Sequence, residues 1–493
     1  MKKGKVYLVG AGPGDEGLIT VKGLTAIQKA DVILYDRLIN PNLLESAPSQ
    51  CELIFCGKLP KQHLLKQEII NDILIDKAMK GYNVVRLKGG DPGVFGRVGE
   101  EAEALAEHEI PFEIVPGISS GIAVPLYAGI PVTHRAYGIS FALVSAHDKS
   151  KEGKPDIDWN GLVASVDTIA FYMGVSNISY IADNLILHGK PKETPVILIQ
   201  WGTYGRQKTL QGTIGDIAEK VKEKGIQNPA ITLVGDIVSL RDKLKWFENK
   251  PLYGRQILLA RTGTARSPLA EQLKEHGADV IEIPKWTKKD VPLNVSILNQ
   301  LFTYKRILFT SPESANEFID LLINRNIDIR NVRAELYCLS KKSLKVLKER
   351  GLSGRLAAEM NFFGPLLIVG NRSLNVKKIP YIEQDGKHDI LQTSETILDE
   401  SFIPAVRQIL TETSLDTIIF PSSSSVDAFM EYGGYYGIEP AALIKKLTIV
   451  CMGKSSGQQI NEYGYTPDSV LSEPNAFELV KALIQEKVLE SIK

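Results

Sequence analysis

The alternation of short apolar runs with longer amphipathic stretches constrains this chain more than any other feature. Residues 6–9, 32–35, 84–87 and 196–199 are rich in Val, Ile and Leu, and helix-like segments separate them. Continuous apolar runs of this length, followed by helical periodicity, are typical of βα units. The sequence therefore predicts an α/β protein built mainly on parallel sheets.

The length of the chain predicts more than one hydrophobic core. The chain has 493 residues, whereas a single core rarely serves more than about 250 to 300. Residues 243–254 are polar and broken by Pro251, and a new apolar run follows at 256–260. We expect a boundary near Lys250, with domains at residues 1–247 and 251–493.

Charge and composition exclude several classes of partner. Lys and Arg number 58, and Asp and Glu also number 58, so the net charge is zero and offers no long-range attraction to nucleic acid or anionic membranes. No apolar run approaches the length that spans a bilayer. We expect neither a nucleic-acid nor a membrane partner, and a cytoplasmic location.

Cysteine and histidine spacing gives no support to a disulfide framework or a metal site. Four cysteines are few for so long a chain, and Cys51 and Cys56 do not form a CxxC pair. Seven histidines occur without the spacing of zinc ligands. We expect four buried thiols and no metal.

The C-terminal half contains an internal repeat. FTSPESANEF at residues 309–318 aligns without gaps to FPSSSSVDAF at 420–429, and CLSKKSLKVLKERG at 338–351 aligns to CMGKSSGQQINEYG at 451–464. Each copy reads as a strand, a polar turn and a helix. The repeat predicts two similar α/β lobes whose turns present hydroxyls and helix N-termini to a shared cleft, which suits an anionic ligand.

A glycine-rich loop follows the first apolar run. Gly12, Gly14 and Gly17 match G-x-G-x-x-G, and Asp36 lies about where a dinucleotide-binding fold places its ribose-binding acid. Pro13 removes one backbone N–H, however, and Asp15 places a negative charge where phosphates would bind. The loop favours a ligand without phosphates, and a nucleotide-dependent oxidoreductase or a turn without any ligand stays an alternative.

Further motifs occur in one order through the first half. They are LVGAGPGDEGLIT, LYDRL, CGK, VVRLKGGDPGVFGR, VPGISS, YAGIPVTHR, FYMG and NPAITLVG. Together they resemble the tetrapyrrole methylase family, and within it the uroporphyrinogen-III C-methyltransferases. The resemblance implies a two-lobed α/β domain that binds S-adenosyl-L-methionine between its lobes, methylates uroporphyrinogen III at C2 and C7 to give precorrin-2, and forms a homodimer.

Site residues follow from matching these motifs to the family. The implied cofactor contacts are Pro13, Gly89, Gly90, Asp91, Val94, Ser119, Ser120, Met173 and Gly202. The glycines of the GGDP segment permit close approach of a ligand, and the Asp91 carboxylate suits a ribose or an amino group. Asp36 is implied as proton acceptor and Lys58 as proton donor, as general acid–base chemistry at a pyrrole carbon requires.

The substrate has eight carboxylates, so its pocket should be locally basic. The ordered motifs contain Arg37, Lys58, Lys61, Arg86, Arg97, His134 and Arg135. Charged groups of this kind form strong hydrogen bonds with carboxylates. We expect Arg37, Arg97 and Arg135 to bind substrate, although any one of them can instead be a solvated surface charge.

From about residue 255 the chain resembles the uroporphyrinogen-III synthase family, through ILLARTGTARSPLAEQLKEHGADVIEIP and the two Ser-rich turns. The resemblance implies cyclisation of hydroxymethylbilane to the type III isomer, which the first half then methylates on a route to sirohaem, cobalamin or another tetrapyrrole. Candidate substrate-binding residues are Arg261, Thr310, Ser311, Ser422, Ser423 and Lys454.

Two alternatives apply to the C-terminal half. The serines of the turns can be helix caps and nothing more. The segment near residues 391–393 also lacks the tyrosine expected there, which favours a catalytically inactive tetrapyrrole-binding module.

Overall fold

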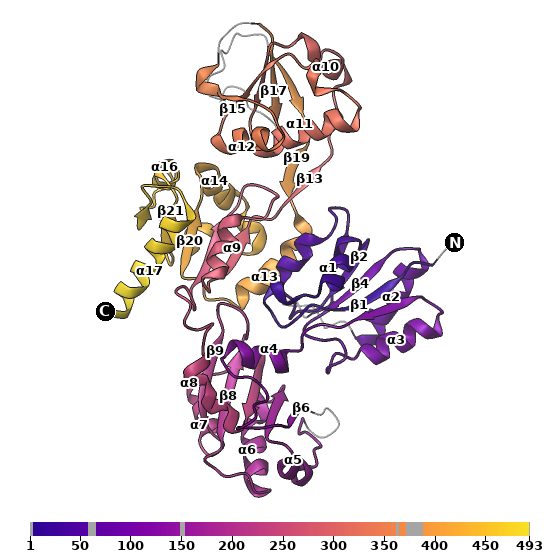
Figure 1. The fold of residues 1–493 in the computed structure, drawn as a ribbon, viewed down its shortest axis with the longest axis vertical. Coiled ribbons are helices and arrows are strands. Elements are labelled where there is room, and N and C mark those ends of the chain that lie inside the picture. Colours follow the sequence, from indigo (N-terminus) through magenta and orange to yellow (C-terminus); the bar gives the residue numbers. More distant parts are fainter. Residues whose placement is uncertain (1–2, 58–65, 148–152, 361–363, 371–387, 493) are drawn as a thin grey trace. The chain divides into compact units, whose positions relative to one another are not determined.

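The computed structural model describes residues 3–57, 66–147, 153–360, 364–370 and 388–492 (Figure 1). Contacts group the chain into two units, each described here by itself. The first comprises Met1–Thr262, Arg266–Pro284 and Glu400–Lys493, and the second Gly263–Ala265 and Lys285–Asp399. The predicted boundary near Lys250 separates two families of motifs, whereas the contacts place both sides of it in the first unit.

A five-stranded parallel sheet forms the first lobe of the N-terminal half, in the order β3-β2-β4-β1-β5. Its strands are β1 (Val6–Gly10), β2 (Val32–Tyr35), β3 (Glu52–Phe55), β4 (Val84–Lys88) and β5 (Phe112–Val115). The helices of this lobe are η1 (Glu16–Leu18), α1 (Val21–Gln28), η2 (Pro41–Ser46), α2 (Gln67–Met79) and α3 (Val98–Glu107). Every residue of β2 and β4 is buried, as expected for parallel strands covered on both faces.

The second lobe also has five strands, in the order β6-β7-β10-β8-β9, but only β6 and β7 pair in parallel. Its strands are β6 (Phe141–Ser145), β7 (Thr168–Tyr172), β8 (Pro195–Gln200), β9 (Lys208–Thr213) and β10 (Ala230–Val234). Its helices are α5 (Trp159–Ser165), η4 (Val175–Asn177), α6 (Ile178–Leu187), α7 (Ile217–Lys224), η5 (Asp236–Leu240) and α8 (Arg241–Leu244), and α4 (Ser120–Tyr127) precedes the sheet. This lobe is the exception to the mainly parallel sheets that the sequence predicts, and a short connection between β8 and β9 makes that pair antiparallel.

The C-terminal part of the first unit is a parallel sheet in the order β12-β11-β20-β21-β22. Its strands are β11 (Gln256–Ala260), β12 (Asp279–Ile283), β20 (Thr417–Phe420), β21 (Thr448–Cys451) and β22 (Ser469–Val470). Its helices are α9 (Pro268–Glu275), η10 (Glu400–Phe402), α13 (Ile403–Thr411), α14 (Ser423–Tyr432), η11 (Gly433–Tyr436), α15 (Pro440–Ile444), α16 (Lys454–Glu462) and α17 (Ala476–Ile492).

The second unit has a parallel sheet in the order β16-β15-β14-β17-β18 and a separate antiparallel pair, β13 with β19. Its strands are β13 (Trp286–Lys289), β14 (Arg306–Phe309), β15 (Glu335–Cys338), β16 (Arg355–Leu356), β17 (Leu366–Gly370), β18 (His388–Gln392) and β19 (Glu395–Leu398). Its helices are α10 (Val295–Asn299), η6 (Leu301–Thr303), α11 (Pro312–Asn324), η7 (Ile329–Asn331), α12 (Lys341–Glu349) and η8 (Ala357–Glu359).

The internal repeat is confirmed at the level of single elements. The first copy forms β14 and α11, then β15 and α12. The second copy forms β20 and α14, then β21 and α16. In both copies the aligned phenylalanines pack ring against ring, with centroids 5.5 Å apart for Phe309 and Phe318 and 5.9 Å apart for Phe420 and Phe429. The repeated sequence thus encodes one strand–turn–helix unit twice.

The expectation of four buried thiols holds for three of them. Cys56, Cys338 and Cys451 are buried, whereas Cys51 is half-buried, because it lies in the loop before the half-exposed edge strand β3. None of the helices in the described part of the chain has both the length and the apolar character that a bilayer-spanning segment requires.

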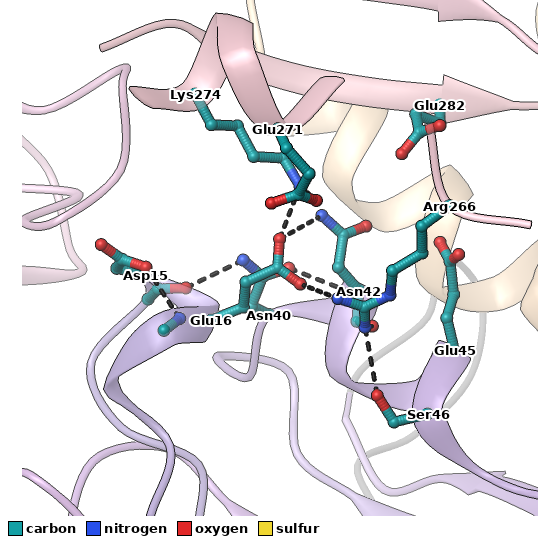
Figure 2. Close-up of polar contacts among 12 residues, drawn as sticks. Asp15, Glu16, Asn40, Asn42, Glu45, Ser46, Arg266, Glu271, Lys274 and Glu282 are labelled. Carbon is teal, nitrogen blue, oxygen red and sulfur yellow. Dashed lines mark hydrogen bonds and ion pairs between the residues drawn. The ribbon is translucent and has the colours of Figure 1, made fainter. Parts of the chain in front are cut away.

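Within the first unit, ion pairs join η1 to α9 and to the loop that precedes it (Figure 2). The Glu16 carboxylate, whose side chain is 14% exposed, lies 3.0 Å from the Arg266 guanidinium and 2.5 Å from the Lys274 amine. Arg266 also donates to the Asn42 carbonyl at 2.7 Å. Burial opposes the charge on Lys274, but Glu16 outweighs it and raises the pKa of the amine. The glycine-rich loop therefore continues into a segment fixed by charge pairing.

Candidate functional site

Three loops of the first lobe approach each other at backbone distance. Gly12 and Gly90 form an isolated antiparallel bridge, in which the Gly90 N–H donates to the Gly12 carbonyl at 2.8 Å. A Cβ atom built on Gly117 would lie 2.3 Å from the Gly90 carbonyl oxygen and 2.8 Å from the Gly10 Cα. Such a contact is impossible without a shift of backbone. The glycines of three separate motifs are therefore needed where the loops after β1, β4 and β5 meet, at the carboxyl edge of the parallel sheet where open α/β folds bind ligands.

The glycine-rich loop has no position left for a phosphate. Asp15 caps η1 by accepting from the Gly17 N–H at 2.8 Å, and its second oxygen accepts from the Tyr127 hydroxyl at 2.7 Å. The Asp15 N–H donates to the Thr203 hydroxyl at 2.9 Å. A carboxylate thus occupies the place that pyrophosphate takes in a dinucleotide fold. This arrangement argues against the oxidoreductase alternative.

These loops border a cavity of about 560 Å³, a volume that suits a cofactor-sized ligand. Every cofactor contact implied by the motifs lines this cavity, namely Pro13, Gly89, Gly90, Asp91, Val94, Ser119, Ser120, Met173 and Gly202. The proposed acid–base residue Asp36 and the proposed substrate ligand Arg37 line it as well. Residues more than a hundred positions apart in the sequence are therefore brought to one surface.

Asp91 joins two of the loops. One carboxylate oxygen accepts from the Gly93 N–H at 2.8 Å and the other from the Gly117 N–H at 2.9 Å. A carboxylate has about four acceptor positions, so each oxygen keeps a lone pair after these bonds. Asp91 can thus hold the loops in place and still accept a hydrogen bond from a ligand.

Tyr172, in the FYMG motif, is a cavity residue that the motif comparison did not single out. Its hydroxyl lies 2.6 Å from the Ser119 hydroxyl and accepts from the Gly121 N–H at 2.5 Å. Its ring packs edge-on against Phe95 at 5.0 Å. The tyrosine thus fixes the N-terminal turn of α4, whose Ser119 and Ser120 face the cavity. The sequence signal that could have identified Tyr172 is its position next to Met173 in the FYMG motif.

Left-handed backbone is concentrated at the cavity. Phe95, Met173 and Trp201 all line it, and their φ angles are 57°, 56° and 51°. Non-glycine residues rarely adopt this conformation, which costs of the order of 1 to 3 kcal/mol unless the surroundings enforce it. Strain of this kind is typical of ligand-binding loops.

Asp36 follows β2 and is held by a buried arginine. The Arg86 guanidinium donates to one Asp36 oxygen at 2.5 Å, and the Asp36 side chain keeps 34% of its surface exposed toward the cavity. Arg86 itself is 2% exposed. Arg86 is one of the basic motif residues that could have made the substrate pocket basic, but its buried position in β4 removes it from the solvent side of the cavity. It serves Asp36 instead.

The other basic candidates have different surroundings. Arg37 lines the cavity and pairs with Glu412 at 2.5 Å. Arg97 is exposed, has a left-handed φ of 58° and pairs with Glu100 on the first turn of α3. Arg135 is exposed in the loop between α4 and β6. Lys58, like Lys61, lies outside the described residues.

In the C-terminal half, the predicted residues of the Ser-rich turns are tied to the fold. Ser311 and Ser422 each accept from the N–H three residues later, at 3.0 Å and 3.2 Å, and Ser314 and Ser425 complete a capping box in each copy. The Thr310 hydroxyl donates to the Val369 carbonyl at 3.1 Å. Ser423 begins α14 and is half-buried, and Lys454 begins α16 and is exposed.

Arg261, the remaining candidate, is 7% exposed at the end of β11. Its guanidinium lies 3.0 Å from Glu45 and 3.9 Å from Glu282, both within the first unit. A guanidinium compensated by two carboxylates has less charge to offer a substrate.

Two family models divide the chain. Tetrapyrrole (Corrin/Porphyrin) Methylases matches residues 5–218, and Uroporphyrinogen-III synthase HemD matches residues 215–367 and 392–481. The segment between the two HemD matches, residues 368–391, contains all but the last residue of β18, together with residues 371–387, which lie outside the description.

Relatives cover both halves of the chain. A uroporphyrinogen-III C-methyltransferase of Bacillus subtilis (strain 168) is 47% identical over 94% of this chain and 95% of its own length. The porphyrin biosynthesis protein HemD of Ruminiclostridium josui is 35% identical over 94% of each chain. A solved uroporphyrin-III C-methyltransferase of Thermus thermophilus, complexed with S-adenyl homocysteine, is 37% identical, covers 48% of this chain and all of its own, and has a TM-score of 0.42. The chain therefore belongs to the tetrapyrrole methylase family in its N-terminal half and to the uroporphyrinogen-III synthase family in its C-terminal half.

Proposed function

We propose that the chain is a bifunctional enzyme of tetrapyrrole biosynthesis. Its C-terminal half converts hydroxymethylbilane to uroporphyrinogen III, and its N-terminal half methylates that product at C2 and C7 with S-adenosyl-L-methionine to give precorrin-2. One observation supports the methyltransferase assignment above all others: every cofactor residue implied by the motifs lies on the same cavity.

The residues of the cavity fit S-adenosyl-L-methionine, which is a cation with a ribose diol and no phosphate. Leu38, Val94 and Ile199 give the walls an apolar surface. The glycine backbones allow close approach, and Asp91 supplies a carboxylate with acceptor capacity to spare. When bound, the cofactor supplies an electrophilic methyl group on its sulfonium.

The acid–base work falls to side chains on the same surface. After methyl transfer the substrate must lose a proton, and the Asp36 carboxylate, held by Arg86 and open to the cavity, is placed to accept it. Arg37 lines the cavity, and its proposed role is to bind a substrate carboxylate in exchange for Glu412. Lys58, as proton donor, and Arg97 and Arg135, as further substrate ligands, complete the proposed set.

In the synthase half, the proposed task is to hold an anionic linear tetrapyrrole in a folded shape while a hydroxyl leaves. Positioning by several hydrogen bonds suffices for this, without a dedicated nucleophile. Thr310, Ser311, Ser422, Ser423, Lys454 and Arg261 stay candidates for that role. The Ser422 hydroxyl accepts from the backbone and keeps a proton that it can donate.

We also propose that the methyltransferase half forms a homodimer. Phe112, Ile114, Ile118, Ile122 and Leu126, from β5, α4 and the segment between them, are 36–45% exposed. Large apolar side chains gathered at a sheet edge favour burial against a second copy. Ile122→Glu should shift the protein toward monomer in sedimentation velocity, with Lys80→Gln, at the exposed residue just after α2, as control. An unchanged dimer, or a monomeric parent, would contradict the proposal.

The decisive assay gives the purified chain fresh hydroxymethylbilane and S-adenosyl-L-methionine, and analyses the mass and ring isomer of the products. A dimethylated type III product supports both activities. Exclusively type I macrocycle, methylated or not, would mean that closure was spontaneous and would favour the second candidate, a methyltransferase with an inactive tetrapyrrole-binding module. The commitment of Ser311 and Ser422 to capping boxes is the observation that favours this candidate.

A further inference from the structure

Behind Asp36, four side chains of alternating charge form a continuous chain of contacts. Arg86 donates through one terminal nitrogen to Asp36 at 2.5 Å and through Nε to Glu101 Oε1 at 3.0 Å. The Lys88 amine donates to the same Glu101 oxygen at 2.7 Å. The order is therefore Asp36, Arg86, Glu101, Lys88, with no net charge. Only Asp36 and Lys88 reach the cavity.

The inner three members are almost completely buried. Arg86 is 2% exposed, Lys88 3% and Glu101 0%. Ions at such depth are costly unless each is paired with good geometry. Burial opposes the charge on Arg86, but Asp36 and Glu101 outweigh it and raise the pKa of the guanidinium, whereas burial and Arg86 together lower the pKa of Lys88. Apolar side chains of similar volume would stabilise the core at least as well as these buried ions. The four charged residues therefore point to a role in function and not in stability.

Glu101 links the four charged side chains to helix α3. It lies on the first turn of α3, while Arg86 and Lys88 lie two residues apart on β4 and so share one face of the sheet. One Glu101 oxygen receives Arg86, Lys88 and, at 3.1 Å, the amide of Gln67 from α2. The other oxygen is buried without a hydrogen-bond partner among the described residues. The bonds are thus concentrated on the oxygen that faces the arginine.

We propose that Glu101 is a positioning residue for methyl transfer, acting through Arg86 on Asp36. A guanidinium is planar, so the bond from its Nε to Glu101 fixes the direction in which the terminal nitrogen points. That nitrogen holds the Asp36 carboxylate, whose side chain is otherwise a third exposed and able to change rotamer. The inference rests on the proposed role of Asp36 as proton acceptor and adds the residues that orient it.

The test compares Glu101→Gln with Glu103→Gln, an exposed glutamate on the same helix. Glutamine has nearly the shape of glutamate but binds the guanidinium without charge. With uroporphyrinogen III and S-adenosyl-L-methionine as substrates, we expect kcat of Glu101→Gln to fall by about tenfold or more. The KM for uroporphyrinogen III and the Kd for S-adenosylhomocysteine should stay within about threefold of the parent values. Glu103→Gln should match the parent in all three quantities.

A double mutant separates positioning from a general loss of structure. If Glu101 acts through Asp36, Glu101→Gln should have little further effect on kcat in an Asp36→Asn background, because the group that it positions is already lost. Additive losses, or a parent-like kcat in folded Glu101→Gln, would overturn the inference. Parent-like turnover in Asp36→Asn alone would instead overturn the proposed role of Asp36, and the inference with it.

Arg86→Lys keeps the test decisive if Glu101→Gln does not fold. The substitution retains the positive charge beside Glu101, but an ammonium lacks the fixed fork that joins Glu101 to Asp36. We expect the same fall in kcat with S-adenosylhomocysteine binding retained, which also verifies the fold. A parent-like kcat in this variant would show that the direction imposed on Asp36 is irrelevant to turnover.

Discussion

The turn after β1 and the turns after β14 and β20 all lead from a buried parallel strand toward a helix, yet they are built differently. In the two Ser-rich turns, the serine hydroxyls bond within their own copy, since Ser311 and Ser422 each accept from an N–H of the helix that follows. The turn after β1 instead pairs with residues distant in sequence, through the bridge of Gly12 to Gly90 and the bond of Asp15 to Thr203.

The difference teaches how to weigh a polar motif. A serine that caps the helix after it is explained by that helix. A turn that depends on other loops fixes several of them at once, and here those loops border a cavity. Motifs that converge from several strands are thus stronger indicators of a ligand site than one motif repeated.

The largest expected effect on turnover follows from replacing Asp36, the proposed proton acceptor at the cavity. Asp36→Asn should lower methyl-transfer turnover at least about tenfold, because an amide cannot accept the proton. Binding of S-adenosylhomocysteine, measured by titration calorimetry, should stay near that of the parent. Asp72→Asn, at an exposed position of α2, is the matched control. Unchanged turnover in Asp36→Asn would remove the carboxylate from the mechanism.

The convergence of loops can itself be broken with one methyl group. In Gly117→Ala the new Cβ would lie 2.3 Å from the Gly90 oxygen, so the loops must separate, and we expect a loss of about 1 to 3 kcal/mol in the free energy of unfolding. Affinity for S-adenosylhomocysteine should fall as well, because Gly90 lines the cavity.

Gly99→Ala provides the control of opposite sign. Gly99 lies in α3, and a Cβ there would have no atom within 4 Å. Alanine should therefore stabilise the helix by about 0.5 to 1 kcal/mol. Chemical denaturation measures both variants. Equal stability of the two would mean that the loops are not packed as closely as the structure has them.

Much of this arrangement was predictable from the sequence, for identifiable reasons. Apolar runs gave β1, β4, β8 and β11 within a residue or so at each end, because strands buried on both faces leave a continuous hydrophobic signal. The residues singled out in the ordered motifs lie together on one cavity, because the loops after β1, β4 and β5 meet at the carboxyl edge of the parallel sheet.

What was not predictable depends on partners distant in sequence. The antiparallel pairing of β10 with β7 and β8 is set by the path of the connections and not by the residues of the strands. In the sequence Arg86 resembles any other basic residue. Only the structure shows that its charge is paired with Glu101, on the helix after β4. The half-buried position of Cys51 depends likewise on which strand lies at the edge of the sheet.

In the second Ser-rich turn, Ser422→Ala should lower the free energy of unfolding by about 1 kcal/mol, the usual value of a lost N-cap, and should lower the melting temperature. Ser422→Thr keeps an accepting hydroxyl and should restore most of the loss. Ser311→Ala should behave in the same way, because its copy of the turn has the same capping box. If Ser422→Ala leaves the melting temperature unchanged but raises the KM for hydroxymethylbilane, the serine binds substrate and the contrast between the two kinds of turn fails.

The smallest expected effect is a difference in thiol reactivity between the cavity and the repeated strand–turn–helix units. Cys56 lines the cavity, whereas Cys338 and Cys451 occupy equivalent positions in the two copies of the repeat. Burial raises the pKa of Cys56 and Cys451 to about 11 and that of Cys338 to about 12. Since only the thiolate reacts, alkylation by iodoacetamide should be slow near neutral pH and rise about tenfold per pH unit below these values.

S-adenosylhomocysteine should protect Cys56 alone, because only that thiol lines the cavity in which we place the cofactor. Peptide mass spectrometry after timed alkylation at about pH 9 follows each thiol separately, and Cys451 and Cys338 serve as internal controls in the same sample. Protection of all three would indicate that the ligand stabilises the chain as a whole and not one cavity. Protection of none would mean that the ligand binds elsewhere. The converging loops would then have no role in cofactor binding, and the contrast with the Ser-rich turns would fail.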